Sequence, residues 1–117
     1  MPDDFSRFLP LAPASLHILL ALSGEDLHGY GILQQVARQS GGQYKLGPGT
    51  LYDNLQRLLT KGLVQEAGSR SGAAESRRRY YRLTAMGRRV ISAEIVRLER
   101  VIRGAKEHLL PAKPRSA

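Results

Sequence analysis

The sequence predicts a mostly helical domain that carries one small β-hairpin. Apolar residues recur every three or four positions in four segments, which is the spacing of one buried helix face. Between the third and fourth segments the pattern changes to alternation, which is typical of a strand with one buried face. The 117 residues, of which 42% are hydrophobic, fit a single folded domain.

The first two helices are predicted over Pro13–Ser23 and His28–Gln39. Pro13 suits a first helical turn, where a backbone N–H has no partner inside the helix. Glycines follow both segments and favour helix ends there. In the second helix we expect one face to pack on the core, through Tyr30, Leu33, Val36 and Ala37.

A third helix is predicted from Pro48 to about Lys61. At about 100° per residue, four leucines fall on one arc that faces the core: Leu51, Leu55, Leu58 and Leu59. The opposite arc is polar and holds Thr50, Asp53, Arg57, Thr60 and Lys61. Between the two arcs lie Asn54 on one flank and Tyr52 and Gln56 on the other.

A hairpin with a basic tip is predicted after the third helix. Leu63–Glu66 is a short strand candidate, residues 67–77 are small and polar, and Arg78–Leu83 alternates as a second strand. In this second strand Arg79, Tyr81 and Leu83 would share one face.

The last helix is predicted to start after Thr84, which suits an N-cap, and to end at about Leu110, before Pro111. It spans about 40 Å, longer than a domain of this size needs for its own core. Its apolar residues form a seam of the coiled-coil type. The seam predicts a dimer contact; a helix packed along its own domain is the alternative. The seam residues are Ile91, Ile95, Leu98, Ile102, Ala105 and Leu109.

The chain would then divide into a unit of three helices and the hairpin with an N-terminal extension (residues 1–84), a dimerisation helix (residues 85–110) and a disordered tail (residues 111–117). This division follows from the order of the predicted elements and from the polar composition after Pro111.

Positive charge is concentrated around the hairpin. The chain carries 18 Lys and Arg against 10 Asp and Glu, a formal net charge of +8. Residues 63–89 hold seven arginines and two glutamates, whereas residues 1–27 hold one basic and four acidic groups. A segregated positive surface attracts polyanions, of which nucleic acid is the commonest. An arginine-rich surface kept for solubility explains the same charge.

Three helices, a strand, a basic loop, a strand and a long helix follow the plan of a winged helix-turn-helix. In that plan the third helix enters the major groove of DNA and the hairpin, or wing, follows the backbone. Residues 1–84 would then be a winged helix-turn-helix DNA-binding domain with an N-terminal extension. Arg57 would bind guanine or a phosphate, and Tyr52 would contact DNA or pack at the rim of the core. The predicted DNA-binding residues are Gly49, Thr50, Tyr52, Asp53, Asn54, Arg57, Arg70, Arg77, Arg78 and Arg79.

Four blocks of sequence resemble the PadR family of transcriptional regulators. They are Leu27-His28-Gly29-Tyr30, Pro48-Gly49-Thr50-Leu51-Tyr52, Lys61-Gly62-Leu63-Val64, and Arg78-Arg79-Tyr80-Tyr81-Arg82-Leu83-Thr84 with Gly87-Arg88. The resemblance implies a homodimeric repressor that binds a pseudo-palindromic operator, in the smaller subgroup with a single C-terminal helix. The chain departs from the family at Gly47, where a serine is usual, and glycine is a weaker helix cap.

The sequence gives no support for catalysis, a metal or a cofactor. It has no cysteine, its three histidines are scattered, and we find neither a phosphate-cradling glycine loop nor a set of residues that would activate a nucleophile. The longest nearly apolar stretch, Phe8 to Leu22, contains two prolines and is too short for a membrane span. We therefore expect a soluble, cytoplasmic protein associated with the nucleoid.

Two other functions stay open at this point. The fold could serve as a protein–protein or effector-sensing module, because winged helices do not always bind DNA. The charge alone would also fit a non-specific nucleic-acid binder. The family resemblance adds a small-molecule effector as a partner to test, since family members often answer to phenolic or drug-like molecules held between the helices of the dimer. This chain has no tryptophan to stack on one.

Overall fold

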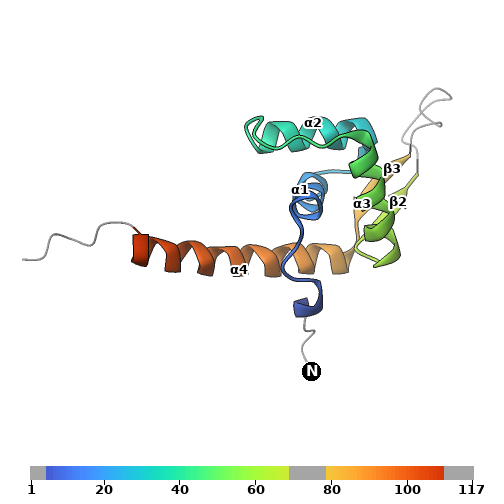
Figure 1. The fold of residues 1–117 in the computed structure, drawn as a ribbon. Helices are drawn as coiled ribbons and strands as arrows, with labels where there is room; N and C mark the ends of the chain where they lie inside the picture. The colour runs from blue at the N-terminus through green and yellow to red at the C-terminus, as the bar shows by residue number, and fades with distance from the viewer. Residues whose placement is uncertain (1–4, 69–78, 110–117) are drawn as a thin grey trace, which may run out of the picture.

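Helices form most of the structure. The computed structural model describes residues 5–68 and 79–109. Three helices pack on one another beside a small sheet: α1 (Pro13–Leu22), α2 (Gly29–Gln39) and α3 (Pro48–Thr60). A fourth helix, α4 (Ala85–Leu109), passes under this group and extends far beyond it (Figure 1). A short 3-10 helix, η1 (Phe5–Phe8), precedes α1. The predicted fold class is confirmed, whereas the predicted tail after Pro111 lies outside the described residues.

Local chemistry at the helix starts explains where the helices begin. Proline occupies the first turn of α1 and of α3, as the sequence predicts. The Nδ1 atom of His28 caps α2 by accepting a hydrogen bond from the N–H of Gly31 at 3.2 Å. Thr84 caps α4, because its hydroxyl accepts a hydrogen bond from the N–H of Gly87 at 2.9 Å.

The sheet has three antiparallel strands in the order β1–β3–β2. They are β1 (Leu27–His28), β2 (Val64–Ala67) and β3 (Tyr80–Leu83). In the β2–β3 hairpin Val64 pairs with Leu83 and Ala67 pairs with Tyr80. Tyr81 and Leu83 are buried and Arg82 is exposed, so the predicted alternation of β3 is confirmed over these residues. The sequence did not predict β1.

The core lies between α1, α2, α3 and the sheet. Three of the four predicted leucines of α3 are buried in it and Leu59 is half-buried. The prediction for α2 was wrong at Tyr30, whose side chain is 65% exposed. Ile32 and Val36, one turn apart, are the residues of α2 that are buried in the core. Tyr30 is two residues before Ile32, about 200° around the helix, and so faces away.

The helix α4 packs on the domain only through its first half. Its buried residues all lie between Gly87 and Glu94. From Glu99 to Leu109 every residue except the half-buried Gly104 is exposed. The radius of gyration, 17.6 Å, reflects this extension, since a compact chain of this length would have about 13 Å. Within the described ranges, no helix combines the length and the apolar character that a membrane crossing requires.

Glu94 is a buried carboxylate that joins the N-terminal segment to α4. Its side chain is 1% exposed and accepts hydrogen bonds from the backbone N–H of Leu11 at 2.9 Å and from the guanidinium of Arg97 at 2.5 and 3.0 Å. The hydrogen bonds from Arg97, helped by that from Leu11, hold the pKa of Glu94 below its ordinary value of 4.5, although burial opposes them. The ionised form of Glu94 therefore stabilises the folded state.

Substituting alanine at two different glycines of α4 should change the stability of the fold in opposite directions. A Cβ at Gly87 would collide with the carbonyl oxygen of Leu63, whereas a Cβ at Gly104 would meet nothing within 4 Å. We expect Gly87→Ala to lower the free energy of unfolding by about 2 kcal/mol. Gly104→Ala should raise it by about 0.5–1 kcal/mol, because alanine favours helices. Urea denaturation measures both; equal effects of the two substitutions would contradict the close contact at Gly87.

Glu94→Gln should destabilise the fold by about 1–2 kcal/mol at neutral pH, because it removes the carboxylate charge that accepts hydrogen bonds from Arg97 and from the backbone of Leu11. The folded-state pKa of Glu94 is lowered, so its stabilisation is present above the unfolded value and is lost as pH falls through the folded value. The stability gap between wild type and variant should therefore shrink below about pH 4.5. Glu99→Gln, at an exposed position of the same helix, is the control. A gap that stays constant with pH would contradict this role of Glu94.

Candidate nucleic-acid interface

One face of α3 is polar and open to solvent. Its inner face is buried through Leu51, Leu55 and Leu58. The residues of the predicted outer arc are exposed, and so are Gly49 and the two residues of one flank; together these are Gly49, Thr50, Tyr52, Asp53, Gln56, Arg57, Thr60 and Lys61. We call this exposed set the outer face of α3. Because the leucines fix how the helix is rotated, the outer face points away from the domain.

The first turn of α3 is accessible to a ligand. Gly47 is the N-cap in an extended conformation and makes no side-chain capping bond. The first N–H groups of a helix have no partner within the helix, and they carry a partial positive charge. A Cβ added at Gly47 or Gly49 would meet nothing within 4 Å, and residues 47–50 are all exposed. A phosphate could approach these N–H groups.

Arg57 forms an exposed ion pair with Asp53, one turn earlier on the same helix. The Nη2 atom of Arg57 lies 3.2 Å from the Oδ2 atom of Asp53, and both side chains are about two-thirds exposed, at 65% and 67%. Exposed pairs of this kind contribute less than about 1 kcal/mol. Arg57 is therefore held along the outer face and can exchange Asp53 for another acceptor at small cost.

Tyr52 both packs and remains exposed. Its hydroxyl end lies over Gly29 at the start of α2, where an added Cβ would collide with it. The side chain nevertheless keeps 52% of its surface exposed. The two interpretations of Tyr52, contact and packing, are thus compatible: the ring is positioned by α2 and still offers one side to a ligand.

Asn54 does not belong to the outer face, and its prediction as a DNA contact is corrected. It is 9% exposed. Its amide Nδ2 donates to the carbonyl oxygen of Thr50 at 2.8 Å, and its Oδ1 accepts from the hydroxyl of Ser15 at 3.3 Å. The flank on which Asn54 lies is covered by α1, so its side chain links two helices of the domain.

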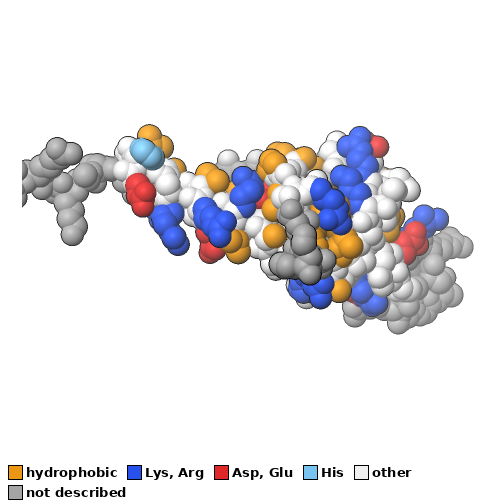
Figure 2. All heavy atoms as spheres, turned by 90° about the horizontal axis from the view of Figure 1, so that it is seen from below, with side chains coloured by type: hydrophobic (Ala, Val, Ile, Leu, Met, Phe, Trp, Pro, Cys, Tyr) orange, Lys and Arg blue, Asp and Glu red, His pale blue; other side chains and the backbone are white. Residues whose placement is uncertain are grey.

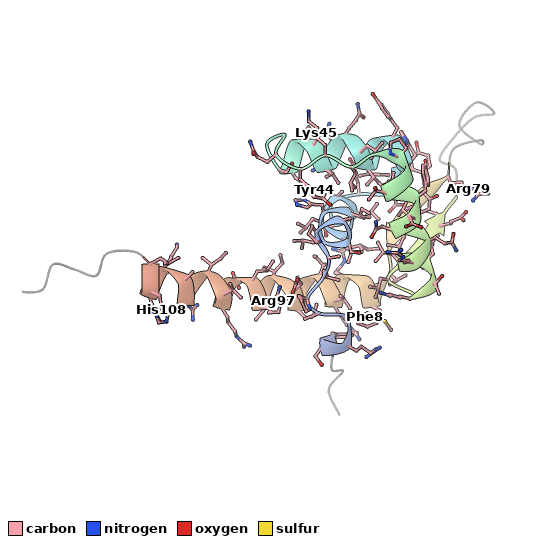
Figure 3. All side chains as sticks on the ribbon, in the orientation of Figure 1. Phe8, Tyr44, Lys45, Arg79, Arg97 and His108 are labelled. Carbon is pink, nitrogen blue, oxygen red and sulfur yellow. The ribbon has the colours of Figure 1, made fainter. Side chains whose placement is uncertain are left out.

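The wing carries one predicted arginine among the described residues. Arg79 stands directly before β3, at the base of the wing (Figure 3), and its side chain is 73% exposed. It lies 3.8 Å from Glu66 of β2. The other predicted wing arginines, Arg70, Arg77 and Arg78, lie outside the described residues. Arg82, on the outer side of β3, is paired with Asp26 through two guanidinium nitrogens, at 2.7 and 3.1 Å.

The sequence of the winged unit matches a known family. Residues 18–93 match the sequence model of the family described as "Transcriptional regulator PadR-like family", which covers well over half of the chain. The chain belongs to the PadR family. This membership makes it a transcriptional regulator rather than an enzyme, and it confirms the resemblance seen in the four sequence blocks.

Relatives of this PadR-family chain cover nearly its whole length. It is 36% identical over 101 residues to "Transcriptional regulator Rv3488" of Mycobacterium tuberculosis, which covers 83% of the chain and 89% of the relative. A PadR family transcription regulator from Clostridium difficile R20291 has the same fold with a TM-score of 0.73, at 26% identity over 84% of this chain and 99% of that one. The fold is shared with BpsR of Bordetella bronchiseptica, whose DNA binding is regulated by 6-hydroxynicotinic acid (TM-score 0.67, 19% identity, 92% of this chain, 71% of that one).

The seam residues of this PadR-family protein become more exposed along α4. Ile91 is 4% exposed, Ile95 is 37%, Ile102 is 53% and Leu109 is 80%, while Leu98 is half-buried and Ala105 is exposed. Figure 2 shows hydrophobic atoms recurring along α4, between charged groups, toward its end. The domain itself thus covers the start of the seam and leaves the rest uncovered.

The structure offers no metal site within the residues it describes: no three His, Asp or Glu side chains come together as ligands. Side chains that could bind a nucleic acid are instead distributed over α3, the wing and the start of α2. Tyr30, for which the sequence favoured packing over a contact with the DNA backbone, is exposed.

Proposed function

We propose that this protein is a homodimeric repressor that binds a pseudo-palindromic operator duplex through α3 and the β2–β3 wing. One observation carries the proposal. The leucine face of α3 is buried, its opposite face is exposed and polar, and the exposed Arg79 stands at the base of the adjacent wing. Family membership supports DNA as the ligand, because PadR proteins are transcriptional regulators.

In this proposal the outer face of α3 enters the major groove, whose width accepts one helix. The open first turn at Gly49 and Thr50 would bind a phosphate. Arg57 would leave Asp53 and bind the O6 and N7 atoms of a guanine with its two-pronged donor group. Arg79, and the predicted arginines of the wing tip, would contact the DNA backbone, which positions the protein without selecting the sequence.

The exposed half of α4 supports the dimer. Apolar side chains at Ile102 and Leu109 are more than half exposed, and a repeating apolar seam on a protruding helix is typical of helix–helix association. A second copy of α4 would cover them. A two-fold dimer presents α3 twice, so we expect half-sites about one helical turn apart, at about 34–36 Å.

Selection from a pool of random duplexes tests the whole proposal. A symmetric motif with two half-sites would support it. Binding to all sequences alike would indicate a non-specific nucleic-acid binder, and the absence of binding at low salt would indicate a protein-interaction module. Because BpsR is regulated by a small aromatic acid, small molecules should also be screened for displacement of the selected duplex.

Substitutions at two arginines should distinguish contacts to bases from contacts to phosphates. Arg57→Ala should weaken binding to the selected operator by about 1–3 kcal/mol and relax selectivity at one position of each half-site. Arg79→Ala should weaken operator and random duplex alike and reduce the slope of log K against log salt by about one unit per half-site. Fluorescence anisotropy at several salt concentrations measures both effects. Arg100→Ala, at an exposed position of α4, is the control, and equal losses from Arg57→Ala and Arg100→Ala would refute the role of Arg57.

A charged side chain introduced into the exposed part of the α4 seam should dissociate the proposed dimer. Ile102→Glu places a carboxylate at a seam position that is 53% exposed, so the monomer should fold while the dimer is disfavoured. Sedimentation velocity should then show a monomer that binds the operator poorly. Val96→Glu is the matched control, because Val96 is 45% exposed and lies outside the seam, about 120° around the helix from Ile102. A dimer that survives Ile102→Glu would show that the seam is not the interface.

A further inference from the structure

Three aromatic side chains form a row at the start of α2. The rings of His28 and Tyr30 are parallel within 3°, with centroids 6.5 Å apart. The ring of His28 also contacts the ring of Tyr80 in β3 edge to face, with an interplanar angle of 87° and centroids 5.4 Å apart. We call His28, Tyr30 and Tyr80 the aromatic row. It extends from Tyr80 on the central strand of the sheet to the solvent at Tyr30.

Tyr30 is exposed but well positioned. It lies in the first turn of α2, and the neighbouring His28 is fixed by its capping bond to the N–H of Gly31. Its side chain is 65% exposed. Among the residues that the structure describes, its hydroxyl has no hydrogen-bond partner. An ordered aromatic ring with an unused hydroxyl is a common feature of binding surfaces, because one side chain supplies both apolar area and a donor.

The aromatic row adjoins both parts of the proposed DNA-binding surface. Gly29, between His28 and Tyr30, lies under the hydroxyl of Tyr52 on the outer face of α3. Tyr80 follows Arg79 directly, and it pairs with His28 across the β1–β3 ladder. The start of α2 therefore lies next to the first turns of α3 and the base of the wing, as Figure 1 also shows.

We propose that the hydroxyl of Tyr30 donates a hydrogen bond to a backbone phosphate of the duplex that α3 binds, and that His28 positions it. The inference rests on the proposed function and extends the DNA contact to α2. Tyrosine is among the residues that contact phosphates in protein–DNA complexes. The hydroxyl of Tyr30 has no hydrogen-bond partner among the described residues, and Arg79 directly precedes Tyr80 in the sequence. Both observations favour a phosphate as the ligand of Tyr30 over an apolar protein surface.

The experiment compares two tyrosines that each lie parallel to a histidine. Tyr44 stacks on His17, with centroids 4.4 Å apart, and follows the far end of α2. Figure 3 shows Tyr44 well separated from Arg79. Tyr30→Phe removes only the proposed donor, and Tyr44→Phe makes the same chemical change away from the DNA-binding surface. The probes are the duplex recovered by selection and a random duplex of equal length, each followed by anisotropy.

Tyr30→Phe should weaken binding to both duplexes by about tenfold or more for each half-site, the effect of one lost hydrogen bond to a charged group. Because tyrosine is neutral, the slope of log K against log salt should stay unchanged, unlike the reduced slope of Arg79→Ala. Tyr44→Phe should bind as wild type. Wild-type affinity of Tyr30→Phe, or an equal loss in Tyr44→Phe, would overturn the inference while leaving the proposed function intact. If wild type binds neither duplex, the proposed function itself fails.

The positioning role of His28 has its own readout. His28→Asn keeps an acceptor that can cap α2 but removes the ring that faces Tyr30. We expect it to lower affinity in the wild-type background and to have little further effect in Tyr30→Phe, since both changes then disrupt the same contact. Thermal unfolding would verify that both variants fold. An equal loss in the two backgrounds would show that His28 does not act through Tyr30.

Discussion

The arrangement of the molecule depends on a small set of hydrogen bonds and contacts where α3, the sheet and α4 meet. The hydroxyl of Thr84 donates to the carbonyl oxygen of Gly62 at 2.6 Å and accepts from the N–H of Gly87. The N–H of Thr84 donates to the carbonyl oxygen of Leu63, the same atom that leaves no room for a side chain at Gly87. One residue thus ends β3, begins α4 and holds both against the turn that follows α3.

This junction sets the direction of α4 relative to α3. The turn at Gly62 needs a positive φ of 78°, which glycine adopts without strain. Glu94 adds a second attachment two turns further along α4, by way of Leu11. Since α4 is thereby fixed at two points, any dimer formed through its free half would hold the two copies of α3 at a defined separation. Dimerisation through α4 would then determine the spacing of the two copies of α3 on the DNA.

The sequence predicted the elements whose signals are local. Pro13, Pro48 and Thr84 mark helix starts by their own chemistry, and the leucine spacing of α3 correctly predicts which face is buried. The sequence failed where partners are distant. The strand β1 is only two residues long and exists because β3 pairs with it. The hydrogen bond between Glu94 and Leu11 joins positions 83 residues apart.

The same limit explains the errors within the candidate site. A helical wheel placed Asn54 on the flank of α3 but could not show that Ser15 of α1 lies beside it. The helical pattern placed Tyr30 on the packed face with Leu33, Val36 and Ala37, but Tyr30 lies about 200° from the buried Ile32 and is exposed.

The pair formed by Asp53 and Arg57 has a consequence for selectivity. Asp53 competes with any incoming acceptor for the guanidinium of Arg57, but weakly, because an exposed pair contributes less than about 1 kcal/mol. A single phosphate oxygen offers little advantage over it, whereas the two acceptors on the edge of a guanine match the guanidinium fork. In the proposed complex Asp53 would therefore add only a small preference, at most about 1 kcal/mol, for guanine over a single phosphate oxygen.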